Sequence, residues 1–293
     1  MWDNIPRNGR VWLFLSDASP PDAARLQAPL ARLLRPLVRL LVRSGVTFPA
    51  LCDLLRELYV NVAEYDFALT GKEQTDSRVS LLTGVHRKEV RRLRGAGAPV
   101  HVVPAALSRT SKIVAVWLAA PEFTDRAGKP LPLPRVTGGS GPSFEKLVAS
   151  VTRDVRPRAV LDEWLDRKLA TIDAEDRVVL VEPGFMPASG SDQQLYYFGR
   201  NLHDHVAAAV ANVLGETPRF FERSVHYDGL SAALAQRLEQ RARELAMAAI
   251  QAANREAHDA ALTDEGGNAR WNFGAYIFTE DDPDEKPPTG APR

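Results

Sequence analysis

The sequence predicts a mainly α protein with small β hairpins, an α+β fold in which tandem winged helix-turn-helix-like units precede a helical C-terminal domain with one or two short strands. Apolar residues that recur every three or four positions indicate amphipathic helices over most of the chain. A short β-branched run on each side of residues 173–176 indicates a hairpin. Two helix pairs that repeat one spacing of serine and valine indicate the tandem units.

Composition is that of a globular protein of two or three domains: the chain has 293 residues, of which 45% are hydrophobic and 25% charged. Its one cysteine, Cys52, excludes a disulfide framework and a thiolate zinc site within one chain. A reducing, cytoplasmic location is therefore expected. The apolar run at residues 11–15 is too short for a signal peptide, and no run is long enough to span a bilayer, so no membrane partner is expected.

The two halves of the chain differ in charge although the net charge is zero. Residues 1–170 contain 26 Lys and Arg against 17 Asp and Glu, a balance of +9, and residues 171–293 contain 11 against 20, a balance of −9. Such asymmetry predicts that the basic half binds a polyanion. The alternative is chance combined with an acidic tail, since residues 280–285 (EDDPDE) supply five of the negative charges.

Gly- and Pro-rich stretches and the acidic end divide the chain into five predicted segments. They are a disordered extension (1–21), a helix-turn-helix domain (22–104), a second winged-helix-like domain (105–188), a helical C-terminal domain (189–279) and a disordered acidic, Pro-rich tail (280–293).

The first domain begins with two predicted helices, at residues 26–43 and 48–69. Pro29 and Pro36 are expected to kink or restart the first helix, since each removes a backbone donor. The leucine face of this helix is expected to find its partner in the second helix, whose inward face is Leu51, Leu54, Leu55, Leu58, Val62 and Tyr65. A basic amphipathic helix also suits a membrane surface, an alternative that the apolar helix directly after it disfavours.

The rest of the chain yields further helices and short strands. Predicted helices cover residues 111–119, 144–151, 157–169, 193–214 and 230–262. Predicted strands cover residues 171–172, 177–181 and the aromatic run 271–278 (WNFGAYIF), with 100–103 and 220–227 as further candidates. The Ala-rich helix at residues 230–262 offers a surface for dimerisation or for packing within the chain.

Residues 76–94 (DSRVSLLTGVHRKEVRRLR) match a helix-turn-helix at several positions at once. Ser80 is small where the second helix crosses the first, and Gly84 suits a tight turn that needs φ > 0. Asp76 or Ser77 is expected to cap the first helix. The residues between the two helices are apolar, as a buried wedge requires: Val79, Val85, Val90 and Leu93.

The exposed side of this segment is basic, with six Lys and Arg against two Asp and Glu. The second helix of such a motif enters the major groove of duplex DNA and presents its early residues to base edges. Predicted base contacts are His86, Arg87 and Arg91. Predicted phosphate contacts are Arg78, Lys88, Arg92 and Arg94. Double-stranded DNA is therefore the predicted partner, and the alternatives are a protein docking surface or a basic face that is only solvated.

The second unit repeats this plan less closely. Ser150, Val155 and Val160 keep the spacing, but Asp154 takes the glycine position and Trp164 the last apolar one. Its second helix mixes basic residues with acidic ones, which disfavours base recognition. It is expected to touch phosphate or to act as a spacer, and the arginines available for phosphate are Arg153, Arg156 and Arg158.

No catalytic constellation stands out, so no enzymatic activity, cofactor or metal is predicted. The chain has no Gly-x-Ser-x-Gly motif, and the Gly-rich residues 137–143 lack the Gly-Lys-Ser/Thr end of a phosphate-binding loop. His203 and His205 stand two positions apart on a helix and point to different faces, which disfavours a metal site. Asp228 before Gly229 suits a helix start better than catalysis.

The block SRVSLLTGVHRKEVRRL, preceded by GVTFPALCDLL and followed by FERSVHYDGLS and FGAYIF, resembles an uncharacterised bacterial family of unknown function with an N-terminal winged helix-turn-helix. The resemblance covers roughly residues 25–280 and is clearest at residues 76–94. It implies a DNA-binding protein, with transcriptional regulation as an open role, and no catalytic residues. The acidic C-terminal half is expected to form a homodimer or to bind another partner, since dimers read two half-sites.

Overall fold

The structure, a computed structural model, describes residues 21–95, 105–136, 138–181 and 190–280. Within these ranges it is mainly helical, with nine α-helices, one 3-10 helix and one three-stranded antiparallel sheet. The chain divides into two compact units: unit 1 combines Met1–Val102 with Ala209–Phe220, and unit 2 combines Val103–Ala208 with Phe221–Arg293. The five predicted segments stay a prediction, and the extension (1–21) and tail (280–293) lie almost entirely outside the described residues.

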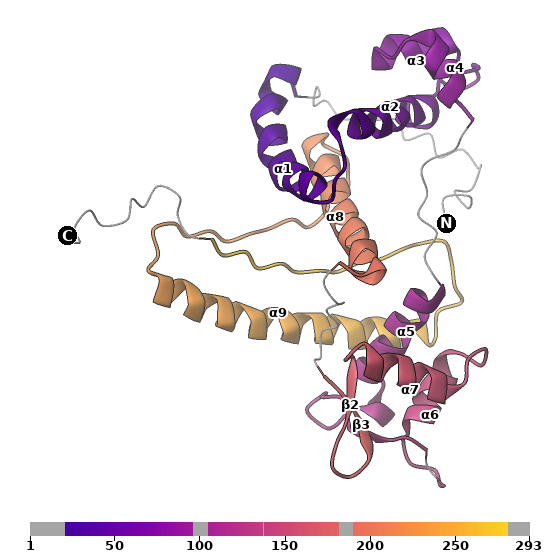
Figure 1. Cartoon of the computed structure of the whole chain (residues 1–293), viewed down its shortest axis with the longest axis vertical. Coiled ribbons are helices and arrows are strands. Elements are labelled where there is room, and N and C mark those ends of the chain that lie inside the picture. Colours follow the sequence, from indigo (N-terminus) through magenta and orange to yellow (C-terminus); the bar gives the residue numbers. More distant parts are fainter. Residues whose placement is uncertain (1–20, 96–104, 137, 182–189, 281–293) are drawn as a thin grey trace, which may run out of the picture. The chain divides into compact units, whose positions relative to one another are not determined.

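Unit 1 contains the helices α1 (Ala23–Arg43), α2 (Phe48–Tyr65), α3 (Asp76–Thr83) and α4 (Arg87–Leu93) (Figure 1). Helix α1 begins at Asp22, whose carboxylate accepts a hydrogen bond from the Ala24 N–H (3.2 Å). Pro29 and Pro36 both lie inside it, so of the predicted kink or restart the restart is wrong, and the kink stays a prediction. Each proline removes only one backbone donor, and the hydrogen bonds on either side carry the helix past it.

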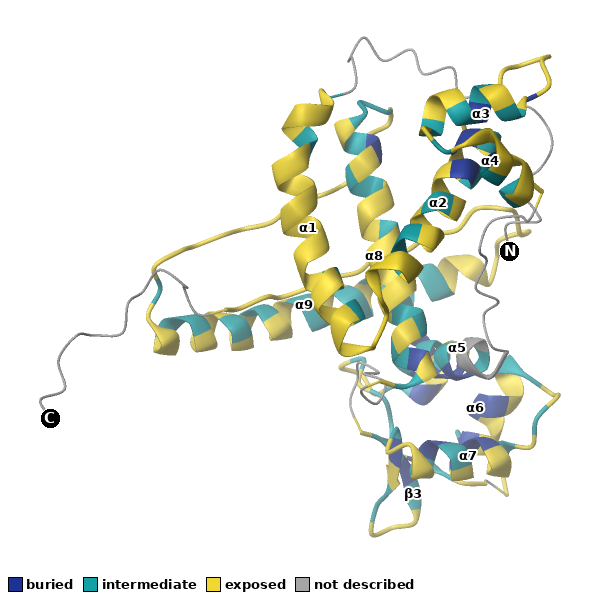
Figure 2. Ribbon diagram, turned by 45° about the horizontal axis from the view of Figure 1, so that its top comes forward, coloured by how far each residue is buried: buried dark blue, intermediate teal, exposed yellow. Residues whose placement is uncertain are grey.

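The apolar faces of α1 and α2 are not buried as predicted, and α1 is exposed along its length in Figure 2. No residue of α1 is buried. Most of the predicted inward residues of α2 are exposed, by 36–57%: Leu54, Leu55, Leu58, Val62 and Tyr65. The buried residues of α2 are Val60 and Ala63 instead. Periodicity identified an apolar face but not what covers it, because coverage depends on elements elsewhere in the molecule.

The body of unit 2 alternates short helices with a small sheet. Its elements are α5 (Ala105–Ala119), the 3-10 helix η1 (Pro121–Phe123), β1 (Leu133–Pro134), α6 (Phe144–Val151), α7 (Pro157–Asp166), β2 (Ala170–Ile172) and β3 (Arg177–Leu180). The sheet order is β1-β3-β2, and both pairings are antiparallel, with Leu133 and Ile172 opposite Val178. The predicted hairpin at residues 171–181 is therefore confirmed.

Three large aromatic side chains form the centre of the unit 2 core, which Figure 2 shows in dark blue on α5, α6, α7 and β3. The ring of Trp117 lies 6.0 Å from that of Phe144 and 6.3 Å from that of Trp164, and the Phe144 and Trp164 rings are 5.5 Å apart. All three side chains are at most 1% exposed. Because each such ring buries about 150–250 Å², this cluster is the main apolar stabilisation of the unit.

The C-terminal region consists of two helices and two extended segments. Helices α8 (Asp192–Val213) and α9 (Ala232–Ala261) agree with the predicted helices at residues 193–214 and 230–262. The predicted strands at residues 220–227 and 271–278 are wrong, since the described residues 190–280 contain no strand and both segments are extended but unpaired. A strand needs a neighbouring edge for its backbone hydrogen bonds, and composition alone cannot supply one. The candidate at residues 100–103 lies outside the described residues.

Candidate nucleic-acid interface

Helices α3 and α4 pack together and on α2 through a small apolar core. Val60 and Ala63 of α2, Val79 of α3 and Val90 of α4 are buried. Two more side chains from the sequence-predicted wedge, Val85 and Leu93, pack against them. The four predicted apolar residues therefore do meet between the helices. Because the buried side chains are small, polar contacts must supply part of the stability of this helix pair.

The turn between α3 and α4 is held by its own side chains. Gly84 has φ 72°, the left-handed conformation that favours glycine, and its N–H donates to the Ser80 carbonyl (2.9 Å). The Ser80 hydroxyl donates to the Val85 carbonyl (2.7 Å), while Thr83 Oγ1 accepts from the Val85 N–H (3.1 Å). The tight turn predicted at Gly84 is confirmed, and these bonds fix the angle at which the chain enters α4.

Side chains just before each helix satisfy its first backbone donors. Thr75 Oγ1 accepts a hydrogen bond from the Arg78 N–H (3.2 Å), so Thr75 caps α3 and the predicted cap at Asp76 or Ser77 is wrong. At the start of α4, His86 Nδ1 accepts from the Lys88 N–H (3.3 Å). Asp76 is free for another role because Thr75 already fills the capping position.

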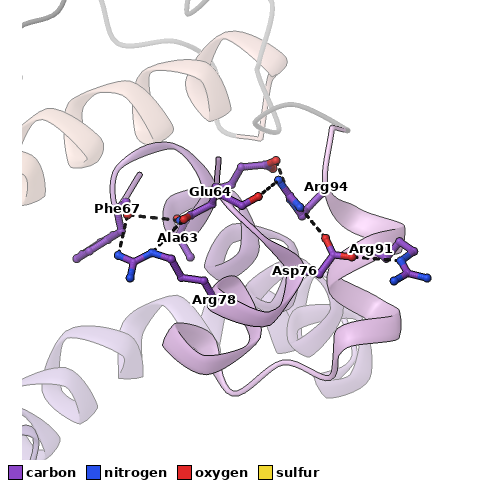
Figure 3. A network of polar contacts seen from close by, with 8 residues as sticks. Ala63, Glu64, Phe67, Asp76, Arg78, Arg91 and Arg94 are labelled. Atoms are coloured by element: carbon purple, nitrogen blue, oxygen red, sulfur yellow. Dashed lines mark hydrogen bonds and ion pairs between the residues drawn. The ribbon is translucent and has the colours of Figure 1, made fainter. Parts of the chain in front are cut away.

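Arg94, which follows α4, ties the three helices together. Its guanidinium donates to Asp76 Oδ1 (2.6 Å), to Glu64 Oε1 (3.0 Å) and to the carbonyl of Gln74 (2.6 Å). Figure 3 shows Arg94 between Glu64 and Asp76, with Arg91 on the far side of Asp76. The Arg94 side chain is only 24% exposed. These contacts, together with those of Gln74 and Arg78 described next, are called the polar clasp.

Gln74 is the buried centre of the polar clasp. Its Nε2 donates to the Ala63 carbonyl (2.5 Å), and its Oε1 accepts from Arg78 Nε (3.0 Å). Arg78 also donates to the carbonyl of Phe67 (3.2 Å), beyond the end of α2 (Figure 3). Arg78 and Arg94 thus provide hydrogen-bond partners for the Phe67 carbonyl and the Glu64 carboxylate, polar groups near the end of α2.

The polar clasp shifts the pKa values of Asp76 and Arg94 in the directions that favour their charged forms. Hydrogen bonds from Arg94 and then Arg91 hold the pKa of Asp76 below its usual value. The hydrogen bond to Asp76 in turn raises the pKa of Arg94, against the effect of partial burial. Both groups therefore stay charged at neutral pH and hold α3 against the end of α4.

The seven sequence-predicted contact residues fall into distinct environments. Arg78 and Arg94 are held in the polar clasp, and His86 caps α4. Arg91 is 82% exposed although it pairs with Asp76 (3.1 Å), and Arg92 is 60% exposed although it pairs with Glu89 (2.9 Å). Arg87 and Lys88 are exposed, and no acidic group of the described chain lies within ion-pair distance of either. The cations available to a ligand are therefore at the start of α4 and along its outer side.

Sequence reasoning missed Glu64 and Gln74. Glu64 lies 30 positions before Arg94, so no local spacing connects them. The only local sign of a role for Gln74 was its position just before the residue that caps α3. Its burial could not be predicted, because its side chain bonds to backbone carbonyls near the end of α2. Leu81 of α3 was also missed as a surface feature, since 84% of it is exposed.

The corresponding helix pair of unit 2 has a different surface. Arg158 faces Asp162 along α7 at 4.0 Å, and Arg167 pairs with Glu163 at 3.1 Å. In the β2–β3 turn, Asp173 accepts from Arg177 and holds that side chain (2.8 Å). Two of the four arginines around α7 therefore have an acidic partner, whereas Arg153 and Arg156 are exposed with no acidic group of the described chain within ion-pair distance. This surface mixes paired cations with available ones.

The two histidines considered from the sequence as a metal site, His203 and His205, each lie near one acidic side chain. His203 Nδ1 lies 3.0 Å from Asp204, and His205 lies 3.4 Å from Glu222. Among the described residues no three His, Cys, Asp or Glu side chains group as metal ligands would. A depression on unit 2 is lined by residues of α9 alone and gathers no convergent polar groups from other elements. Within the ranges that the structure describes, each helix is too short or too polar to cross a bilayer.

Comparison with known proteins identifies a family. A model described as a family of unknown function (DUF6502) matches residues 23–285. No curated protein and no solved structure matches the chain. The match spans both units and includes α3, α4 and the polar clasp.

Proposed function

Because the chain belongs to the DUF6502 family, whose function is unknown, we propose its function from the geometry of α3 and α4: non-enzymatic binding of duplex DNA, in the manner of a helix-turn-helix. Helix α4 enters the major groove, and transcriptional regulation in the cytoplasm is the role that such binding serves. The observation that carries the proposal is the pair Arg87 and Lys88, exposed at the first turn of α4 with no acidic group of the described chain within ion-pair distance of either side chain.

The proposal assigns DNA contact to four of the seven residues that the sequence predicted for it. Arg87 and Lys88 lie where a recognition helix meets base edges and phosphates, and Arg91 and Arg92 extend the basic face along the helix. Arg91 and Arg92 have single ion pairs at exposed positions, and phosphates can replace such partners because exposed pairs contribute little. Arg78 and Arg94 support the helix pair from behind through the polar clasp, and His86 orients the first turn.

The helix pair of unit 2 differs from α3 and α4 in how its arginines are paired. We propose that unit 2 forms the winged-helix-like unit that the sequence predicts, a proposal supported by its order of helix, strand, helix, helix and two strands, with sheet order β1-β3-β2. Because two of the arginines around α7, Arg158 and Arg167, have acidic partners, we assign unit 2 the role of a spacer or partner module. Under this proposal the basic charge that attracts DNA is concentrated in unit 1.

The test is a pair of charge-matched double variants of the full chain. Arg87→Glu/Lys88→Glu changes the first turn of α4, and Arg156→Glu/Arg158→Glu makes the same change in net charge at the start of α7. Acidic residues in a first helical turn favour the helix, so both variants should fold. Binding to a fluorescent duplex is measured by anisotropy over a range of salt concentrations.

We expect the α4 variant to lose at least tenfold in affinity. The slope of log affinity against log salt should fall by roughly 2, since each lost phosphate contact removes about 0.9. The α7 variant should keep most of the affinity and the slope. Equal losses in the two variants would show that net charge, and not α4, governs binding, and a wild-type chain that ignores duplex DNA would remove the proposal altogether.

Leu81 favours one alternative, a docking surface for another protein. A leucine that is 84% exposed on α3, beside Leu82 at 46%, is unusual for a face that meets only DNA phosphates. Binding through these leucines would depend little on salt, whereas DNA binding falls steeply as salt rises. The salt series therefore separates the two functions.

A further inference from the structure

Helix α9 lacks the packing that a helix of its length usually has. It runs for 30 residues, and none of them is buried. Its C-terminal part rests on α5, where Asn254 Nδ2 donates to the Ala115 carbonyl (3.0 Å). Toward its N-terminal end, Leu238 and Leu245 are 45% and 56% exposed. Because most helical stability in proteins comes from packing of an apolar face, this part of α9 is expected to have a partner.

Two extended segments, one just before and one just after α9 in the sequence, carry the largest exposed side chains of unit 2. They are called arm 1 (residues 221–231) and arm 2 (residues 264–280). In arm 1, Phe221 is 87% and Tyr227 is 74% exposed. In arm 2 the exposed aromatic side chains are Trp271 (65%), Phe273 (43%), Tyr276 (69%) and Phe278 (73%). Within the described chain, neither arm pairs with a strand.

Polar contacts nevertheless hold the arms in place. Arg270 of arm 2 donates to both carboxylate oxygens of Asp204 on α8 (2.6 and 2.7 Å), and Asn272 donates to the same group (2.7 Å). These bonds, those of Arg270 first, keep the pKa of Asp204 below its usual value. His205 of α8 meets the Tyr276 ring of arm 2 at 5.5 Å and Glu222 of arm 1 at 3.4 Å. Both arms thus contact α8 through polar side chains.

The exposed area of the arms is that of a stable interface. At about 200 Å² per aromatic side chain, the six rings expose roughly 800 Å². A standard interface buries about 800 Å² on each partner, and the largest apolar patch of a typical monomer is about 300–600 Å². The face of α8 beside the arms adds Leu195, Phe198 and Leu202, which are 40–52% exposed.

A second copy of the chain fits this surface better than other occupants. An extended segment can pair antiparallel with its own two-fold mate, so that one arm supplies the missing edge for the other. Residues 192–280 contain 12 acidic residues against 8 arginines, a mixed surface with a small negative excess. Two copies therefore repel one another only weakly, whereas a nucleic acid gains nothing from this surface.

We infer that arms 1 and 2, with the apolar face of α8, form the interface of a homodimer of this chain. The two arms of one protomer cover those of its partner, and the aromatic side chains become its core. The inference does not depend on DNA binding, since it concerns a different surface. A dimer would also present two copies of α4 to one duplex, which is how small DNA-binding units gain affinity.

The first experiment measures the mass of the full chain without DNA, by size-exclusion chromatography with light scattering. The wild type should have twice the 32.2 kDa of one chain. Trp271→Glu/Phe278→Glu should give monomers, since charges would enter the interface. The matched control Val136→Glu, at a residue of unit 2 that is 66% exposed outside the arms, should stay dimeric. A monomeric wild type, or a Trp271→Glu/Phe278→Glu variant that remains dimeric, overturns the inference.

A second measurement covers the case in which that variant fails to fold. The native cysteine is first removed by Cys52→Ser. Gly274→Cys then places a cysteine in arm 2, and Gly138→Cys is the control outside the arms. A Cβ at either glycine meets no atom within 4 Å. A bifunctional thiol reagent should link Gly274→Cys chains into covalent pairs and leave Gly138→Cys chains single. Equal yields from the two positions contradict an interface at the arms. A dimer that forms these links but does not bind DNA would leave the inference standing and remove only the proposed function.

Discussion

The helix pairs α3–α4 and α6–α7 place a serine at corresponding positions and use it differently. The Ser80 hydroxyl donates across the turn to the Val85 carbonyl (2.7 Å), whereas the Ser150 hydroxyl donates back to Leu147 in its own helix (2.8 Å). Gly84 ends α3 in a left-handed conformation, while α6 ends at Thr152 in an extended one. The same spacing thus gives a left-handed turn bonded through Ser80 in one pair, and in the other an extended connection in which the Asp154 N–H donates to Thr152 Oγ1 (3.2 Å).

The two pairs also depend on different forces. The α3–α4 core has four small buried residues and is completed by the polar clasp around Arg94. The α6–α7 pair packs into the aromatic cluster of Trp117, Phe144 and Trp164 and needs no such clasp. A large core leaves the surface of α7 free to carry acidic residues, whereas α3–α4 uses two of its own arginines for support. Counting basic residues therefore overestimates the cations that α3–α4 can offer to DNA.

The largest expected effect tests the aromatic core of unit 2. Trp164→Ala should lower the free energy of unfolding by about 3–5 kcal/mol, because it opens a large cavity among buried rings. Urea unfolding followed by the fluorescence of the remaining tryptophans measures this. Trp164→Phe is the control and should cost much less, since Trp164 Nε1 has no hydrogen-bond partner in the described chain. Similar losses in both variants would mean that ring packing is not what stabilises this unit.

A smaller effect is expected from the polar clasp. Arg94→Ala should destabilise α3 and α4 by about 1.5–3 kcal/mol, the range for hydrogen bonds to charged groups. Hydrogen exchange of the amides in residues 76–94 of the full chain measures this local loss. Arg87→Ala should leave the exchange rates unchanged, because the Arg87 side chain makes no hydrogen bond or ion pair with the described part of the chain. If Arg94→Ala also left them unchanged, the apolar core alone would hold the pair, and the contrast with unit 2 would disappear.

The smallest effect tests the turn itself. Gly84→Ala should cost about 1–2 kcal/mol, because a Cβ strains the left-handed conformation although no atom lies within 4 Å of it. Gly199→Ala inside α8 also meets open space but has no positive φ, so it should stabilise the chain by up to about 1 kcal/mol. Thermal unfolding of both variants should thus show shifts of opposite sign, and a Gly84→Ala variant as stable as the wild type would contradict a tight turn.

Local patterns in the sequence were sufficient for several elements. Ser80, Gly84 and the valines around them predicted two short helices and a turn, because turn conformation and helical periodicity depend on neighbours a few positions away. The hairpin at residues 171–181 and the long helices α8 and α9 followed from the same kind of pattern. These elements need no distant partner to be recognised.

The sequence by itself determined which helices form, where the α3–α4 turn lies and which charges cluster on α4. Only the tertiary structure decided that Arg78 and Arg94 face inward, since their partners Gln74, Glu64 and Asp76 lie on other elements. It also decided that the leucines of α1 stay uncovered and that the aromatic arms pair with no strand of the described chain, both against prediction. The physical reason is that a periodic pattern defines a face, while burial and ion pairing depend on what the rest of the molecule, or a second molecule, brings to that face.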